Sequence, residues 1–462
     1  MIRTQKQLFG TNGIRGVANK EITAEFCVNI GSAIATHFGR GTLVVGCDGR
    51  TSNQMLKSAV ISGIVSAGLG VLDIGLCPTP ALQYVIPLYG VRGGVMITAS
   101  HNPPEYNGIK VIDRDGVEIS SEEELAIETI YFEKRQHLAE WNMIGTIQME
   151  SKACDVYKEA IKSHVIGKDE ILRTKLKVVV DPANSVGALV TPYVLRELGC
   201  SVITINGHID GSFPGRTPEP TPKTLKDLSK IVISVGADFG VAHDGDADRA
   251  IFVDETGAVQ PGDRTFALIE KHVLSNNPKN KVVTPVASSS MIQEIAKMYN
   301  CEIVWTKVGS VGVSRAILRE NAIIGGEENG GVFFSEFQPV RDGAMTAALI
   351  AEIVSISKKS LSTLLGELPQ YFNVKLKTSC PNEKKAQVIV TILENTREYD
   401  SITIDGTKIL TDDGWVLIRP SGTEPIFRSF AEAKTQERAK ELAEWGISLV
   451  KDAKREASIT PP

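Results

Sequence analysis

Three aspartates alternate along the stretch H-D-G-D-A-D-R at residues 243–249. Side chains at positions i, i+2 and i+4 of an extended segment point to one side, so these carboxylates can supply three hard oxygen ligands to Mg²⁺. The small residues between them leave the backbone free to bring the charges together. The stretch predicts that Asp244, Asp246 and Asp248 bind a metal, and the alternative is a solvated acidic turn.

A calcium EF-hand loop is a more specific alternative, because the aspartates match its positions 1, 3 and 5 and Glu255 matches position 12. That loop requires glycine at position 6 for its sharp turn, whereas this chain has Arg249 there. The flanking residues 239–242 and 250–254 are expected to form strands rather than the helices of an EF-hand. The EF-hand interpretation is therefore rejected.

Ser100 follows a run typical of a buried strand, in the sequence G-V-M-I-T-A-S-H-N-P at residues 94–103. A serine hydrolase favours G-x-S-x-G and needs an oriented histidine base, and T-A-S-H-N-P is a poor fit. A serine at the end of a parallel strand lies at the edge where open α/β sheets bind ligands, and its hydroxyl can carry a phosphoryl group. The alternative is a serine that only caps the following turn.

Two further stretches have the composition of ligand-binding loops. Residues 419–425, R-P-S-G-T-E-P, with Arg428 close behind, combine a guanidinium, two hydroxyls and backbone N–H groups freed by glycine, which suits a phosphate monoester. Residues 325–331, G-G-E-E-N-G-G, place carboxylates and an amide on a flexible loop, which suits the vicinal hydroxyls of a sugar. Arg15 and Lys110 are cations close to glycine. An ordinary turn or a surface charge is the alternative in each case.

Three βαβ units are expected to position these loops. In each unit a short β-branched strand runs into a turn of small or polar residues and then a helix, which implies mainly parallel sheets with right-handed crossovers. Their first strands are expected at residues 43–46, 178–180 and 282–284. Beyond Pro369 the pattern changes to an α+β tail. Its expected strands are 374–378, 401–404, 415–418 and 427–431, and its helices 384–395 and 435–453.

The length of 462 residues is too great for one ordinary core. We expect four domains, which carry the serine, the metal, the sugar loop and the phosphate loop: residues 1–150, 151–258, 259–368 and 369–462. The net charge of -5 argues against a nucleic-acid partner or an anionic membrane. Seven widely spread cysteines without a C-x-x-C pair suggest reduced thiols, and the lack of a signal-peptide pattern or long apolar run suggests a cytoplasmic protein.

The serine, aspartate, sugar-loop and phosphate-loop motifs follow one another along nearly the whole chain. In this chain order they resemble the motifs of the α-D-phosphohexomutase superfamily, which includes phosphoglucomutases, phosphomannomutases and phosphoglucosamine mutases. The resemblance implies a heart-shaped α/β molecule around a central cleft, with three related mixed α/β domains and a C-terminal α+β lid. It also implies an isomerase with Mg²⁺ as cofactor and a hexose 1,6-bisphosphate as activator and intermediate.

The resemblance also assigns roles to the candidate residues. Lys110 becomes a candidate general acid or base, with His101 as a nearby assistant. The residues around the transferring group are Ser100 as phosphoserine, His101, Lys110, Arg15 and Arg249. The metal ligands are the phosphate on Ser100 and the carboxylates of Asp244, Asp246 and Asp248. The sugar is bound by Glu327 and Asn329, and its distal phosphate by a clamp of Arg419, Ser421, Gly422, Thr423 and Arg428.

The implied reaction is reversible: phosphoserine phosphorylates a hexose monophosphate, the bisphosphate turns end for end, and Ser100 takes back the other phosphate. Glucosamine 6-phosphate, converted to glucosamine 1-phosphate, is the first choice of substrate. A phosphomannomutase/phosphoglucomutase of broad specificity is the alternative. A Mg²⁺-dependent sugar phosphatase and a non-enzymatic sugar-phosphate sensor are more distant ones. Hexose phosphates are the expected partners, and monomer and homodimer both stay open.

Several positions depart from many members of the superfamily. Asn329 stands where many have serine, and the loop resembles that of archaeal relatives. Residues 307–310, K-V-G-S, lack a histidine that bacterial phosphomannomutase/phosphoglucomutases carry nearby. Gly422 in place of asparagine resembles phosphoglucosamine mutases and archaeal phosphomannomutases. Arg216 is expected in a region that faces the cleft.

Overall fold

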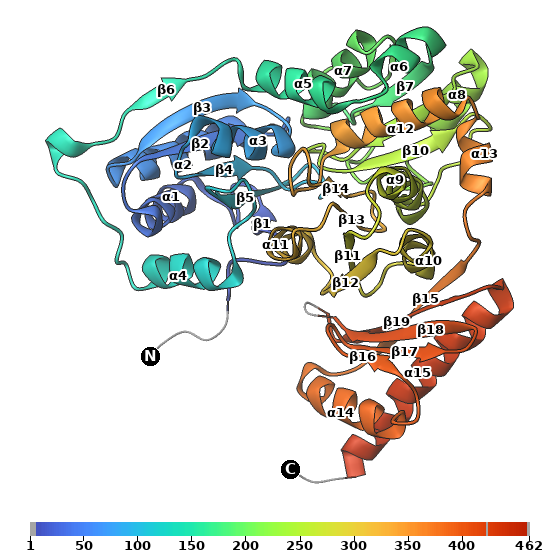
Figure 1. The fold of residues 1–462 in the computed structure, drawn as a ribbon. Coiled ribbons are helices and arrows are strands. Elements are labelled where there is room, and N and C mark those ends of the chain that lie inside the picture. The colour runs from blue at the N-terminus through green and yellow to red at the C-terminus, as the bar shows by residue number, and fades with distance from the viewer. Residues whose placement is uncertain (1–5, 422–423, 460–462) are drawn as a thin grey trace.

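The computed structural model describes residues 6–421 and 424–459, and within these residues the strands form four sheets. Each sheet is built from its own segment of the chain, and we name the four units domains I to IV in chain order. In Figure 1 domain I lies at the left, domains II and III at the right, and domain IV below them.

Domain I has a six-stranded sheet in the order β1-β5-β4-β2-β3-β6. Its centre is parallel, as expected for βαβ units, whereas β5 is antiparallel to β1 and β4. Helices on both faces explain why β2 and β4 are buried almost throughout. The strands are β1 (Ile14–Val17), β2 (Thr42–Cys47), β3 (Gly70–Leu76), β4 (Gly93–Ile97), β5 (Tyr106–Asp113) and β6 (Ile147–Met149). The helices are α1 (Ala24–Phe38), α2 (Asn53–Ser66), α3 (Thr79–Tyr89) and α4 (Ser121–Phe132).

Domains II and III share one plan, a sheet of three parallel strands with one antiparallel edge strand, in the orders β10-β9-β7-β8 and β12-β11-β13-β14. Domain II contains α5 (Ala153–His164), α6 (Lys168–Thr174), β7 (Lys177–Asp181), α7 (Thr191–Glu197), β8 (Ser201–Thr204), α8 (Lys226–Val235), β9 (Phe239–His243) and β10 (Ala250–Asp254). Domain III contains α9 (Gly262–Asn276), β11 (Lys281–Pro285), α10 (Ser290–Met298), β12 (Glu302–Thr306), α11 (Ser310–Glu320), β13 (Ile324–Gly326), β14 (Val332–Phe334), α12 (Gly343–Ser357) and α13 (Leu361–Gly366).

Domain IV has a five-stranded sheet in the order β15-β19-β18-β17-β16, and all its pairings are antiparallel. The α+β tail expected beyond Pro369 is therefore confirmed, and its long last helix packs on the sheet. The elements are β15 (Phe372–Ser379), α14 (Lys385–Asn395), β16 (Ser401–Ile402), β17 (Thr407–Thr411), β18 (Gly414–Pro420), β19 (Ile426–Ala433) and α15 (Gln436–Ile459).

The hydrophobic cores divide the molecule unevenly. One large core includes side chains of domains I, II and III, whereas domain IV has a core of its own. A small cluster of Val286 with Trp415 and Leu417 joins domains III and IV. The apolar contact between domain IV and domain III is thus smaller than the core that domains I, II and III form together. Among the described residues, no helix is both long and apolar enough to cross a bilayer.

Candidate active site

Ser100 lies three residues beyond β4, at the carboxyl end of the parallel strands of domain I. Its backbone is left-handed (φ 48°), which is uncommon for a residue with a side chain. Hydrogen bonds hold this conformation: Thr98 Oγ1 accepts from the amide of Ser100 (2.8 Å) and donates to Asp48 Oδ2 (2.6 Å). Ser100 is fully buried. Its hydroxyl is therefore placed by the fold and not by a loose turn.

Arg50 holds the loop that carries Ser100. Its buried guanidinium pairs with Asp48 (3.2 Å) and donates to carbonyl groups of the loop. The accepting oxygens belong to Ser100 (2.9 Å), Asn102 (2.6 Å), Pro103 (2.6 Å) and Tyr106 (2.9 Å). Sequence analysis assigned no role to Asp48 or Arg50. Their role could have been predicted from the sequence D-G-R, which forms a turn at the carboxyl end of β2, the strand beside β4.

The aspartate loop connects β9 to β10 in domain II and contacts the serine of domain I. Ser100 Oγ donates to Asp244 Oδ2 at 2.7 Å, although the two residues are 144 positions apart. A Cβ atom on Gly245 would lie 2.4 Å from the carbonyl oxygen of Ser100, so glycine is needed for this approach. The strands on either side of the loop agree with the rejection of an EF-hand.

The three aspartates are arranged as a cation site. One oxygen atom from each of Asp244, Asp246 and Asp248 lies within 4.8 Å of the others, and all three side chains are buried. The Oδ1 atoms of Asp246 and Asp248 accept no hydrogen bond from the described residues. A buried carboxylate oxygen without a donor is unfavourable unless a cation compensates it. The residues present therefore fit Mg²⁺, which prefers carboxylate oxygens.

Lys110 neutralises part of this charge. Its ammonium lies 2.6 Å from Asp246 Oδ2 and 3.2 Å from Asp248 Oδ2. Burial opposes the charge of Lys110, but the two carboxylates raise its pKa, and Lys110 in turn lowers the pKa of Asp246 against the effect of burial. Burial raises the pKa of Asp244 well above its usual range, and the charges of Asp248 and Asp246 add to this. A further cation at this place would favour the ionised form of all three carboxyl groups.

Two arginines are directed toward the same loops. Arg15 Nη1 donates to Asn102 Oδ1 at 2.6 Å, close to the serine loop. Arg249 Nε lies 3.8 Å from Asp248 Oδ1, and its Nη1 lies 3.4 Å from Glu219 Oε1. Both guanidinium groups thus border the place where a phosphate on the serine would lie.

His101 lies beside the serine as a neutral imidazole. Its Nδ1 is 3.4 Å from Ser100 Oγ and 3.6 Å from Glu219 Oε2. Burial is the main cause that lowers the pKa of His101 to about 3, and the charges of Arg249 and Arg15 contribute to this shift. Sequence analysis missed Glu219, which contacts both His101 and Arg249 from a loop of domain II. A single carboxylate in a proline-rich loop gave no local signal.

Arg341 connects the aspartates to the predicted sugar loop. This buried guanidinium lies 2.5 Å from Asp248 Oδ2 and 3.4 Å from Glu327 Oε2. Burial opposes its charge, but these carboxylates raise the pKa of Arg341 above its usual value. Thr79, at the start of α3, donates to Asp246 Oδ2 at 2.6 Å. Sequence analysis missed both residues, although R-D-G just before the apolar helix α12 was a possible signal.

The sugar loop follows β13. Glu327 is buried and directed to Arg341, whereas Asn329 is half-buried and its Oδ1 accepts from the amide of Gly331 at 3.0 Å. Asn329 lines a cavity of about 710 Å³ that also has Glu219 and Glu328 on its wall. The structure therefore brings Asn329 and a carboxylate next to His101 into one cavity.

The predicted phosphate clamp lies at the end of β18 in domain IV. Arg419 Nε is 2.8 Å from Asp405 Oδ2, and Arg428 Nη2 is 3.2 Å from Glu424 Oε2. The amide of Glu424 donates to Ser421 Oγ at 3.2 Å. Two clamp residues lie outside the described residues: Gly422 and Thr423. Within residues 6–421 and 424–459, neither arginine forms an ion pair with the serine loop or the aspartates.

Comparison with known proteins decides the family. The sequence matches all four phosphoglucomutase/phosphomannomutase domains, namely domain I over residues 6–138, domain II over 155–257, domain III over 261–372 and the C-terminal domain over 373–445. A phosphoglucomutase/phosphomannomutase of Thermococcus kodakarensis is 48% identical over 97% of this chain and 99% of its own length. The chain belongs to the α-D-phosphohexomutase superfamily.

Other members of the superfamily are also similar over their full length. A phosphoglucosamine/phosphogalactosamine mutase of Sulfurisphaera tokodaii is 46% identical over 94% of this chain and 97% of its own. The crystal structure of a phosphoglucomutase/phosphomannomutase family protein from Burkholderia thailandensis superposes with a TM-score of 0.88 at 28% identity, covering 97% of each chain. The expected α/β fold of four domains is confirmed. The expected borders between the domains stay a prediction.

The region of Arg216 was expected to face the cleft, and its residues Glu219 and Pro220 line the cavity of about 710 Å³. The guanidinium of Arg216 itself is buried 2.8 Å from Asp181 Oδ2 and donates to the carbonyl oxygen of His243 at 2.6 Å. His243 is the last residue of β9, so Arg216 supports the start of the aspartate loop. A buried arginine with a carboxylate partner cannot be distinguished from a surface arginine in the sequence.

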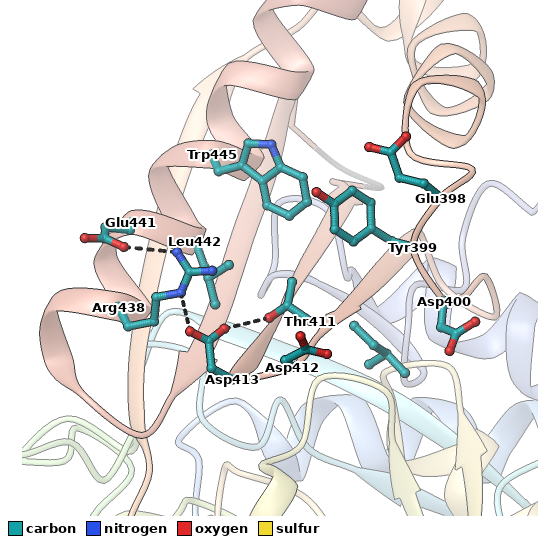
Figure 2. Close-up of a pocket in the computed structure, with 11 residues that line it drawn as sticks. Glu398, Tyr399, Asp400, Thr411, Asp412, Asp413, Arg438, Glu441, Leu442 and Trp445 are labelled. Carbon is teal, nitrogen blue, oxygen red and sulfur yellow. Dashed lines mark hydrogen bonds and ion pairs between the residues drawn. The ribbon is translucent and has the colours of Figure 1, made fainter.

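A second cavity, of about 610 Å³, lies in domain IV (Figure 2). Its wall contains several carboxylates, and Figure 2 shows Arg438 between two of them, with Nε 2.8 Å from Asp413 and Nη1 3.0 Å from Glu441. Of the predicted site residues that the structure describes, none lines this cavity. The candidate active site of this phosphohexomutase fold is therefore the serine and aspartate region.

Proposed function

We propose that this chain is a Mg²⁺-dependent phosphohexomutase that interconverts hexose 6-phosphates and hexose 1-phosphates through phosphorylated Ser100. The contact between Ser100 Oγ and Asp244, beside two carboxylate oxygens without hydrogen-bond donors, carries the proposal. A serine that only caps a turn needs no such neighbours. The family membership agrees with an isomerase of this type.

Phosphoryl transfer is mainly a matter of position and charge. Bound Mg²⁺ would supply the positive charge that offsets the aspartates and the phosphoryl oxygens. Arg15 and Arg249 would bind those oxygens, because Arg15 contacts the serine loop and Arg249 borders the aspartate loop. Lys110 is held between two carboxylates and is the candidate that donates or accepts a proton at the reacting hydroxyl.

The reaction is balanced without another reactant. The bond between the phosphorus atom and Ser100 Oγ breaks, a bond to the free 1- or 6-hydroxyl of the hexose phosphate forms, and the hydroxyl proton is returned to the serine oxygen. The hexose 1,6-bisphosphate then turns over and gives its other phosphate to Ser100. A trace of this bisphosphate would also phosphorylate resting enzyme. Glu327 and Asn329 would bind the hydroxyls, and Arg419, Ser421, Gly422, Thr423 and Arg428 the phosphate that is not reacting.

Glucosamine 6-phosphate is our first choice of substrate. A relative named phosphoglucosamine/phosphogalactosamine mutase is 46% identical, and one named phosphoglucomutase/phosphomannomutase is 48% identical, which keeps a broad-specificity enzyme as the second candidate. The candidate sugars differ at C2, and a site discriminates there only if its polar groups require a particular partner. Free cysteines and the acidic net charge favour a reducing, cytoplasmic location.

The test is to incubate the protein with glucosamine 6-phosphate, mannose 6-phosphate and glucose 1-phosphate, each with Mg²⁺ and a trace of glucose 1,6-bisphosphate. We expect isomerisation of at least one sugar phosphate, with glucosamine 6-phosphate the fastest. Release of inorganic phosphate alone would identify a phosphatase. Binding without turnover, and without a covalent phosphoryl group in the intact mass, would identify a sensor.

Metal dependence is tested separately. EDTA should abolish turnover, and added Mg²⁺ should restore it and raise the unfolding temperature of the wild-type protein. Asp246→Asn removes one ligand charge, so it should weaken the Mg²⁺-dependent rise and slow transfer. Unchanged activity of Asp246→Asn at limiting Mg²⁺ would contradict the assignment of the three aspartates.

A further inference from the structure

We propose that Asp405 is a positioning residue that orients Arg419 and makes the phosphate clamp depend on the loop at residues 307–310 of domain III. The proposal deepens the mutase function proposed above and rests on it. Asp405 lies in the turn between β16 and β17, where sequence analysis found no motif.

The turn is pressed against the strand that carries the clamp. Gly406 has a φ of 84°, and a Cβ atom there would lie 2.4 Å from the carbonyl oxygen of Ile418 and 3.0 Å from Arg419 Cα. Thr407, the next residue, pairs with Ile418 in the sheet. Glycine at this position therefore allows Asp405 to lie directly beside Arg419.

An ion pair borders one side of the guanidinium. Arg419 Nε lies 2.8 Å from Asp405 Oδ2 without the alignment of a hydrogen bond, and the two side chains are only 21% and 18% exposed. Among the described residues, no ion pair or hydrogen bond uses the Nη groups of Arg419. An arginine binds phosphate best with two parallel N–H groups. Asp405 thus holds Arg419 while leaving its outer nitrogens for the distal phosphate.

The same carboxylate oxygen reaches another domain. The amide of Val308 donates to Asp405 Oδ2 at 3.1 Å. Two residues later, Ser310 Oγ accepts from Asn12 Nδ2 of domain I at 3.0 Å, close to the strand that carries Arg15. The backbone of the 307–310 loop therefore connects the contact with Asp405 in domain IV to the contact with Asn12 in domain I. The orientation of the clamp arginine depends on where the 307–310 loop lies.

The kinetic consequence follows from the role of the clamp. The distal phosphate is bound equally in the ground state and in the transition state, so a poorly oriented Arg419 weakens binding without changing the chemical step. For Asp405→Asn we expect KM to rise about tenfold while kcat stays within about threefold. In the Arg419→Ala background the same change should have less than about a twofold effect, because Asp405 acts through Arg419.

The matched control is Asp412→Asn, which removes an exposed carboxylate from the β17–β18 turn of the same domain. This control should leave KM, kcat and the unfolding temperature unchanged. If Asp405→Asn also leaves KM unchanged, or if its effect is fully retained in the Arg419→Ala background, the proposal is wrong. An equal fall of kcat and kcat/KM would also contradict it, because that pattern indicates a role in the chemical step.

A second measurement does not depend on turnover. Hydrogen exchange of the peptide that contains Val308 should become faster in Asp405→Asn and not in Asp412→Asn, since the charged acceptor of the amide is replaced by a weaker, neutral one. Calorimetry with glucosamine 6-phosphate should show about tenfold weaker binding for Asp405→Asn. If the wild-type protein binds this ligand but does not isomerise it, the mutase function fails while these two results still support Asp405. Unchanged exchange and unchanged affinity would overturn the role of Asp405 in an active mutase.

Discussion

The serine region and the phosphate clamp are built differently although both are predicted to bind a phosphate. Ser100, Asp244 and Lys110 are buried and held by contacts from two domains. Arg419 and Arg428 are 21% and 37% exposed, and each has one carboxylate partner within domain IV. A reacting group must be fixed before the transition state forms, whereas a clamp must release and rebind a phosphate in each turnover.

The cores show the same contrast on a larger scale. Domains I, II and III share apolar side chains in one core, whereas domain IV has a separate core and a small joint cluster with domain III. Rotation of domain IV would therefore expose little apolar surface compared with separation of the other domains. This difference agrees with the closing motion expected of the lid, which stays a prediction.

The largest expected effect is at the centre of the serine region. Ser100→Ala removes the oxygen that carries the phosphoryl group, so turnover should fall by at least about a thousandfold. Intact mass spectrometry of the purified variant should lack the species that is heavier by one phosphoryl group. Ser62→Ala, on the exposed face of α2, is the control and should retain both activity and the phosphorylated species.

The next effect tests whether Arg341 belongs to the reacting end. Arg341→Met leaves Asp248 and Glu327 as buried carboxylates without this partner, and such a loss costs about 3 kcal/mol or more. We expect kcat to fall by about a hundredfold at saturating Mg²⁺ and the unfolding temperature to decrease. Arg319→Met, at an exposed position of α11, should change neither. A change confined to KM would place Arg341 with the clamp instead.

A smaller effect is expected at the clamp itself. Arg419→Ala removes a charge that binds the non-reacting phosphate, so KM should rise about ten- to thirtyfold with kcat within about threefold. Steady-state kinetics with glucosamine 6-phosphate measure both constants. A large fall in kcat at constant KM would show that Arg419 acts in the chemical step, as the serine region does, and would contradict its role in the clamp.

The smallest effect concerns Asp263, which lines the cavity next to the sugar loop, between the two regions. Burial is the main cause that raises the pKa of Asp263 to about 6, and the charges of Glu328 and Glu432 contribute to this shift. Between about pH 4 and pH 6 the folded protein therefore binds more protons at Asp263 than the unfolded chain does. The free energy of unfolding consequently falls as the pH rises from about 4 through 6. Asp263→Asn should be more stable than wild type by up to about 3 kcal/mol at pH 7, with no difference below about pH 4. Chemical denaturation at both pH values measures this, and an equal gain at both would contradict the pKa.

Much of the candidate site was predictable because its chemistry is encoded locally. The alternation of three aspartates with small residues, and the serine at the end of a buried strand, specify ligand types and spacing without any long-range contact. The four motifs in order then predicted the superfamily and its α/β fold, both of which are confirmed. The extended β region on both sides of the aspartates follows from the same apolar patterning.

The rest required the tertiary structure, since a partner that is distant in the sequence leaves no periodic signal in the chain. Thr79 and Arg341 gained their roles from contacts with another domain, and Glu219 did so through His101. Arg50 and Arg216 gained theirs from partners elsewhere in their own domains. The sequence by itself determined which side chains can hold a cation and accept a phosphoryl group. The tertiary structure decided which of them are buried together, because burial and charge pairing depend on packing between domains and not on local spacing.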